Sequence, residues 1–179
     1  MEHLLLIAIV LSVPVSLWAV AAAGRNGQLS ISLHVAQSKQ MQLVFGIALL
    51  VATVLMTGGL FGWLLPRYEA GVLTYVTFGA IIGCLALIAL VPHVVDTWRE
   101  PVHTSAAWGL VYAIPVAMLL MLTWPLSMAA WSVGVALTVV IVILLILGLT
   151  RKSLRRWMLY FQSAYLGIFF GFLLVAAYL

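Results

Sequence analysis

The chain has 179 residues, of which 66% are hydrophobic and only 7% are charged. Soluble domains are about half apolar and a quarter charged, so this composition excludes a soluble fold and indicates a protein that lies in lipid. The single cysteine, Cys84, excludes an intramolecular disulfide and a paired-cysteine metal or redox site. The net charge of +4 comes from few basic residues, so we expect no nucleic-acid partner.

Six apolar segments predict six transmembrane helices, because each is long enough to cross a hydrocarbon core of roughly 30 Å. In chain order they span residues 4–23, 41–65, 72–91, 105–123, 126–150 and 157–179. Continuous apolar runs of this length are typical of helices and not of the alternating strands of a membrane barrel. We therefore expect an all-α polytopic membrane protein, in which residues 1–179 form one six-helix domain.

Basic residues are concentrated in alternate connections between the predicted helices. The first, third and fifth connections hold seven of them: Arg25, Lys39, Arg99, Arg151, Lys152, Arg155 and Arg156. The opposite side holds only Arg67. By the positive-inside rule, this bias predicts cytoplasmic connections one, three and five, with both termini outside. We expect the plasma (inner) membrane as the location.

Glycine pairs at four-residue spacing occur in three of the predicted helices. The pairs are Gly58 and Gly62, Gly79 and Gly83, and Gly167 and Gly171. Because glycine has no side chain, such pairs let helix backbones approach closely. They predict helix packing within a tight bundle, or a contact with a second copy or a membrane-protein partner.

No acidic or basic residue lies in the interior of a predicted helix. Pumps, voltage sensors and coupled transporters usually carry such groups at mid-depth, so these classes are disfavoured. Passage of a small solute remains an alternative, with a lining of uncharged polar residues on the helices: Ser12, Ser16, Thr53, Thr57, Thr77, Ser132, Gln162 and Ser163. Ser and Thr in helices more often bond to their own backbone, which makes this alternative the weakest.

Histidine and aspartate are grouped on the side of the odd-numbered connections. The third connection supplies His93, Asp96 and His103, and the first supplies His34. Histidine and carboxylate ligands bind zinc, and a catalytic zinc site needs three of them plus water; alternatively, His and Asp can act as a base and its orienting partner. The spacing matches no specific metal motif, so we favour structural roles such as caps of helix ends.

Haem is a weaker cofactor alternative than zinc. Two axial imidazoles would have to face each other, as His34 with His103 or as His93 with His103. No CxxCH motif is present. We expect no cofactor, with zinc and haem as the alternatives.

Three short motifs form a pattern along most of the chain: Ser30-Ile31-Ser32-Leu33 in the first connection, Val91-Pro92 at the end of the third helix, and Pro101-Val102-His103 before the fourth. This pattern resembles the bacterial six-helix membrane proteins of unknown function that are similar to the damage-regulated autophagy modulator (DRAM) superfamily. The resemblance implies a six-helix bundle and, through eukaryotic relatives, an association with lipid handling and membrane trafficking. The residues that carry over are Ser32, Leu33, Pro92 and His103. The chain departs from the pattern at His34, where the family would have a small or acidic residue.

Three functions are compatible with these features. We favour a non-catalytic membrane bundle that interacts with lipid or serves as an accessory subunit of a larger membrane complex. The main alternative is an interfacial enzyme, a metal-assisted lipid hydrolase that would use His34, His93, Asp96 and His103. Small-solute passage is the third.

Overall fold

A computed structural model describes residues 2–24, 26, 29–151 and 157–179 of the chain. This part contains no strand, and six of its helices are long and apolar enough to cross a membrane. They are α1 (Glu2–Ala22), α3 (Lys39–Gly59, extended to Arg67), α5 (Val72–Leu90), α6 (Arg99–Met121), α7 (Met128–Thr150) and α8 (Met158–Tyr178). The expected all-α bundle of six membrane-spanning helices is therefore confirmed, and the chain is an integral membrane protein.

The second membrane helix extends past the residue at which we predicted its end. After α3, a π-helical turn (Leu60–Leu64) leads directly into α4 (Leu65–Arg67). The N–H of Leu65 bonds to the carbonyl of Leu60, which is the wide spacing of a π-turn. We predicted the end at residue 65, but helical backbone continues through Pro66 to Arg67.

The fourth membrane helix begins at Arg99 and not at Ser105 as predicted. Pro101 lies in its first turn, where a missing N–H costs nothing because those N–H groups have no partner within the helix. The hydroxyl of Thr97 accepts a hydrogen bond from the Arg99 N–H at 3.3 Å. Consequently His103 belongs to α6 and not to the connection before it.

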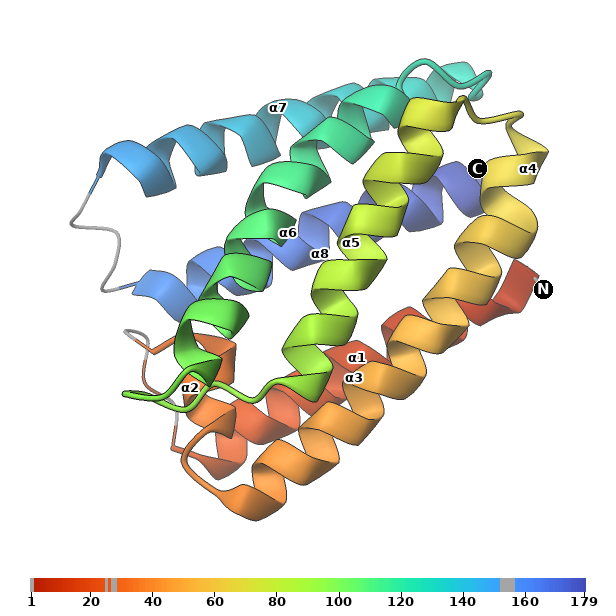
Figure 1. The fold of residues 1–179 in the computed structure, drawn as a ribbon. Helices are drawn as coiled ribbons and strands as arrows, with labels where there is room; N and C mark the ends of the chain where they lie inside the picture. Colours follow the sequence, from red (N-terminus) through yellow and green to blue (C-terminus); the bar gives the residue numbers. More distant parts are fainter. Residues whose placement is uncertain (1, 25, 27–28, 152–156) are drawn as a thin grey trace.

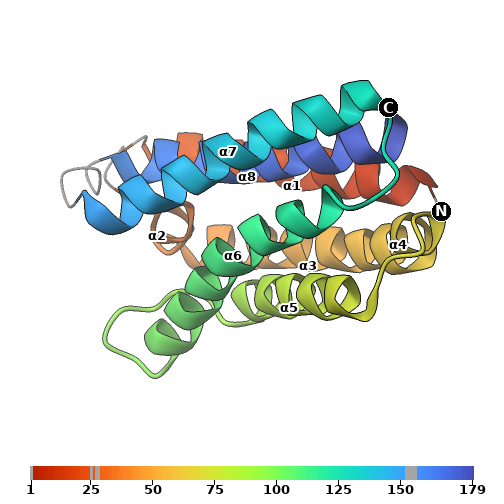
Figure 2. The ribbon, with the colours of Figure 1, turned by 90° about the horizontal axis from the view of Figure 1, so that it is seen from above.

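The helices form a closed ring in which contact is uneven. Contacts are extensive between α1 and α3, α3 and α5, α5 and α6, and α7 and α8, whereas α8 touches α1 and α6 only lightly. Figure 2 shows α7, α8 and α1 along one side and α3 and α5 along the other, with α6 running obliquely between them. The light contact between α6 and α8 agrees with the oblique course of α6.

The bundle has two ends, a terminal end and an α2 end. The terminal end holds both chain termini and the connections 68–71 and 122–127 (Figure 1). The α2 end holds the short helix α2 (Ile31–Val35) and the connection 91–98. The basic residues Arg25, Lys152, Arg155 and Arg156 lie outside the described residues.

The predicted glycine pairs differ in what they face. A Cβ added at Gly58 would lie 3.0 Å from the Cδ1 of Leu4, and Gly62 lies in the π-turn. At the two pairs on α5 and α8 (Gly79, Gly83, Gly167 and Gly171), an added Cβ would meet nothing within 4 Å. Those pairs do not bring two helices of this chain together, and their contact with another chain stays a prediction.

A close approach of two helix backbones occurs at Gly59, which the spacing did not single out. A Cβ there would lie 2.9 Å from the backbone N of Leu5. Atoms do not come so close without a shift, so α1 and α3 pack backbone to backbone at this position.

Candidate functional site

The short helix α2 positions His34 in the interior of the α2 end. Ser30 caps this helix, because its hydroxyl accepts a hydrogen bond from the Leu33 N–H at 3.2 Å. The His34 side chain is fully buried. Its Nδ1 donates to the Ser30 carbonyl at 2.8 Å, and its Nε2 accepts from the Asn26 N–H at 3.1 Å. Both ring nitrogens thus hold the backbone of the first connection, and neither is left for a metal or a proton transfer.

His103 lies in the second turn of α6 and is 4% exposed. Its Nδ1 is 2.7 Å from the carbonyl of Val91, the C-cap residue of α5. A carbonyl only accepts, so Nδ1 carries the proton and donates, and in the neutral ring Nε2 is an acceptor. His103 therefore joins the end of α5 to the start of α6 and retains one acceptor for another group.

His93 packs its ring against the ring of His103. The ring centroids are 5.2 Å apart and the planes meet at 72°. The Nδ1 of His93 is buried and has no hydrogen-bond partner among the described residues. Both rings line a small space of about 20 Å³, whose other polar residues are Ser32 and Gln42 and whose remaining lining is apolar. That volume suits about one water molecule.

The interactions of Asp96 do not involve the histidines. It is exposed, its φ is 61°, and its N–H donates to Glu100 Oε2 at 2.9 Å. In the described ranges, no three His, Cys, Asp or Glu side chains come close enough to hold a metal ion. The four-residue centre of His34, His93, Asp96 and His103 is not assembled in this structure, because His34 is bonded to backbone and Asp96 turns outward.

The two haem arrangements do not fit this geometry either. The edge contact between the rings of His93 and His103 leaves no space for a macrocycle between them. The pair of His34 and His103 fails for a different reason, since both nitrogens of His34 are hydrogen-bonded to the first connection.

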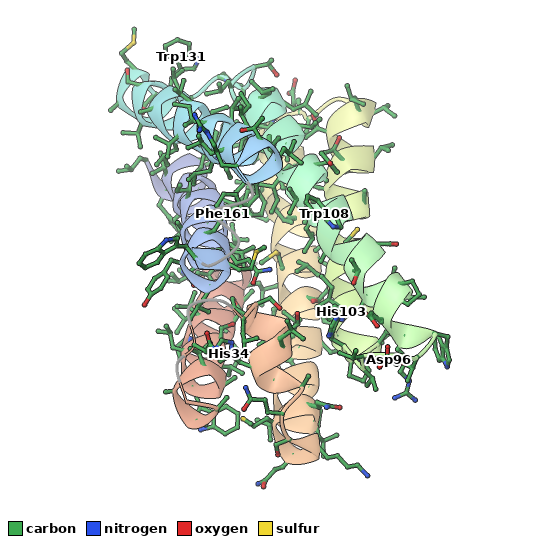
Figure 3. All side chains as sticks on the ribbon, turned by 90° about the vertical axis from the view of Figure 1, so that its left-hand side faces the viewer. His34, Asp96, His103, Trp108, Trp131 and Phe161 are labelled. Atoms are coloured by element: carbon green, nitrogen blue, oxygen red, sulfur yellow. The ribbon has the colours of Figure 1, made fainter. Side chains whose placement is uncertain are left out.

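A cleft of about 250 Å³ lies inside the ring of helices, in its half nearer the α2 end. Its lining comes from α1, α2, α3, α5, α6 and α8 and is mainly aliphatic and aromatic. Figure 3 shows the side of the bundle that is on the left in Figure 1, with α8 and α1 on one side and α5 and α6 on the other. The polar groups of the lining belong to Ser12, Ser16, Ser32, His103, Gln162, Ser163 and Tyr165.

Two hydrogen bonds join α8 to other walls of the cleft, one to α6 and one to α2. The Tyr165 hydroxyl, on α8, donates to the Val111 carbonyl on α6. The Gln162 Oε1, also on α8, accepts from the N–H of Ile31 at 3.0 Å. Ile31 is the first residue of α2, so its N–H has no partner within that helix, and α8 supplies one. The short helix thereby forms a floor under the cleft.

The uncharged polar residues on the helices mostly bond to their own backbone. Seven of the eight residues considered for a solute path donate a hydroxyl to a carbonyl three or four residues earlier: Ser12, Ser16, Thr53, Thr57, Thr77, Ser132 and Ser163. Gln162 alone reaches another element. These residues do not make a continuous polar lining.

The chain matches no protein-family model, no curated protein sequence and no solved structure. The likeness to the damage-regulated autophagy modulator superfamily therefore stays a resemblance of short motifs. Ser32 and His103, two of the residues that carry it, both line the cleft and the small space beside His93. The sequence did not predict the cleft; the one signal for it was Gln162, a lone amide near the start of an apolar helix.

Proposed function

We propose that this chain is a non-catalytic membrane protein that binds a lipid chain in the cleft at its α2 end. The observation that carries the proposal is the cleft itself: about 250 Å³, walled by apolar side chains of six elements. Ligand pockets of roughly 300–1,000 Å³ with apolar walls and few polar groups are the usual binding sites of proteins. In a bundle surrounded by lipid, an acyl chain is the most abundant apolar ligand.

The orientation supports access from the cytoplasmic leaflet. The positive-inside bias counts seven basic residues beside connections one, three and five and one on the opposite side. We infer that the α2 end faces the cytoplasm, with both termini outside, in the plasma membrane. The cleft then opens within the inner leaflet.

The enzyme alternative has less support than lipid binding. It requires His34 and Asp96 as ligands or acid–base groups, and each has a backbone partner or an exposed position. An accessory subunit remains the second candidate, because Gly79 and Gly83 leave an open strip on α5 between exposed Val76 and Leu87. A partner helix would cover that strip, as in other small-residue contacts.

The test is native mass spectrometry of the full chain released from mild detergent, with lipid masses assigned. Gly167→Phe places a ring in the cleft, since Gly167 lines it and an added Cβ meets no atom within 4 Å. Gly171→Phe is the matched control, because Gly171 is one turn further along α8, equally open and outside the cleft. We expect the wild type and Gly171→Phe to carry lipid and Gly167→Phe to lose it. Equal lipid occupancy in all three would overturn the proposal.

A further inference from the structure

Three of the polar residues that line the cleft lie near its α2 end. His103 is the fifth residue of α6, Gln162 the fifth of α8, and Ser32 lies in α2 itself. At a rise of 1.5 Å per residue, the two helical positions lie about 6 Å inside the ends of their helices. With the helix ends taken as the membrane boundary, this depth is that of the interface, where the polar head of a lipid resides.

His103 and Gln162 each have one hydrogen-bonding group that is not used by the described residues. His103 has donated its Nδ1 proton to Val91, which leaves Nε2 as an acceptor. Gln162 has used its Oε1 on Ile31, which leaves its NH₂ group as a donor. A group that both donates and accepts through adjacent oxygens would satisfy the two together.

The absence of charged side chains from the described lining of the cleft argues against a phosphate head group. No Lys, Arg, Asp or Glu side chain lines it in the described part of the chain. Phosphate groups are normally held by Arg or Lys, and a phosphodiester or an ester has no O–H to donate to His103. A carboxylic acid has both features: its O–H donates to Nε2 and its carbonyl accepts from the Gln162 amide. If the proton moves to Nε2, the same hydrogen bond joins imidazolium and carboxylate.

The volume fits one chain. An engineered cavity of about 150 Å³ binds benzene, so a cleft of this size holds roughly ten carbon atoms in proportion. The remainder of a longer chain would extend from the cleft between the lightly contacting α8 and α1 into the bilayer.

We propose that the cleft binds a free fatty acid, with its carboxyl group between His103 and Gln162 and its chain along the open surface of Gly167. This rests on the proposed function and assigns the chemical class of its lipid. Ser32, which shares both cavities with His103, lies at the same polar end.

The test compares palmitic acid with methyl palmitate as ligands of the detergent-solubilised full chain, by titration and native mass spectrometry. The ester has the same chain but no O–H. We expect the wild type to bind the acid at least tenfold more tightly. In His103→Asn, the amide NH₂ takes the place of Nδ1 and keeps the bond to Val91, while the acceptor at Nε2 is lost. We expect this variant to bind acid and ester alike.

The other outcomes separate the two proposals. If wild type binds acid and ester equally and Gly167→Phe excludes both, the carboxyl assignment is wrong and lipid binding in the cleft stands. If lysophosphatidic acid displaces palmitic acid at a tenth of its concentration, the head group is a phosphate and the assignment is likewise overturned. If Gly167→Phe excludes neither ligand, lipid binding in the cleft is itself wrong. A circular-dichroism spectrum of each variant in the same detergent confirms its fold.

Discussion

The terminal end and the α2 end of this bundle are held together by different kinds of contact. At the terminal end, side chains of one helix bond to the backbone of another: Tyr68 donates its hydroxyl to the Ala176 carbonyl at 2.6 Å, and Arg67 donates to the Ala177 carbonyl at 2.8 Å. Tyr68 also stacks on Trp124, with ring centroids 4.7 Å apart. Two of the last carbonyls of α8 are thereby satisfied by the last residue of α4 and the residue after it.

At the α2 end, most polar side chains bond to nearby backbone. His34 holds residues of its own connection, and His103 joins two consecutive helices across the short connection between them. The contacts of Gln162 with Ile31 and of Tyr165 with Val111 are the long-range exceptions. Elsewhere α8 touches α1 and α6 only lightly, and the cleft lies between these helices. The two ends thus differ: distant elements are bonded and stacked together at the terminal end, whereas a cleft lies near the α2 end.

The largest expected effect comes from removing the aromatic closure of the terminal end. Trp124 is 6% exposed and lies between Tyr68 and Phe78. We expect Trp124→Ala to lower the free energy of unfolding by about 3 kcal/mol, since it opens a large cavity in packed rings. The measurement is unfolding by sodium dodecyl sulfate titrated into mild-detergent micelles. The control is Trp98→Ala, because Trp98 is 68% exposed and should change the free energy by less than about 0.5 kcal/mol.

Gly59→Val should have the next largest effect, again near the terminal end. The new Cβ would lie 2.9 Å from the backbone N of Leu5, so α1 must move away. We expect a loss of about 2 kcal/mol in the same assay, as for other overpacked sites. Gly79→Val is the matched control, since an added Cβ meets nothing there. If both variants lose the same amount, the close approach of α1 to α3 is not what stabilises this end.

A smaller effect is expected for a single hydroxyl at the terminal end. Tyr68→Phe keeps the ring on Trp124 and removes the bond to the Ala176 carbonyl. Hydrogen bonds between membrane helices contribute about 1 kcal/mol, and we expect that loss in the unfolding assay. Tyr112→Phe serves as the control, because Tyr112 is half-exposed on α6 and contacts Trp108 through its ring. An unchanged stability of Tyr68→Phe would mean that α8 is held by packing alone.

The membrane spans could be predicted from the sequence, whereas the helix ends near prolines could not. The six spans could be predicted, because membrane helices are specified by continuous apolar runs that each residue supplies independently. The start of α6 could not, since Pro101 is compatible both with a connection and with a first helical turn. The same ambiguity at Pro66 hid the π-turn before it.

The site was harder to predict than the spans. The sequence singled out His103 together with His34 and Asp96, because all were predicted on one side of the membrane. Which nitrogen bonds to which carbonyl depends on the course of the backbone at residues 29–35 and 91–103, and composition carries no information about that. The cleft depends on the angle of α6, which is set by packing against α5 and α7 and leaves no mark in hydropathy.

The α2 end can open locally without unfolding of the whole bundle if its bonds are mainly local. His34→Ala removes two bonds that link residues within the first connection. Local bonds of this kind stabilise a segment against local opening more than the whole fold against unfolding. We expect hydrogen–deuterium exchange of residues 29–38 to rise about tenfold, equivalent to about 1.4 kcal/mol. The free energy of global unfolding should change less than it does for Tyr68→Phe.

The control for that experiment is His93→Ala, whose ring touches His103 but whose Nδ1 holds no described backbone group. It should leave exchange in α2 unchanged. If His34→Ala instead lowers global stability as much as Tyr68→Phe, α2 belongs to the same cooperative unit as the terminal end. The floor of the cleft would then be as rigid as its closed face, and a lipid would have to enter from the side, between α8 and α1. Fast exchange limited to α2 would mean that a lipid can also enter past the short helix.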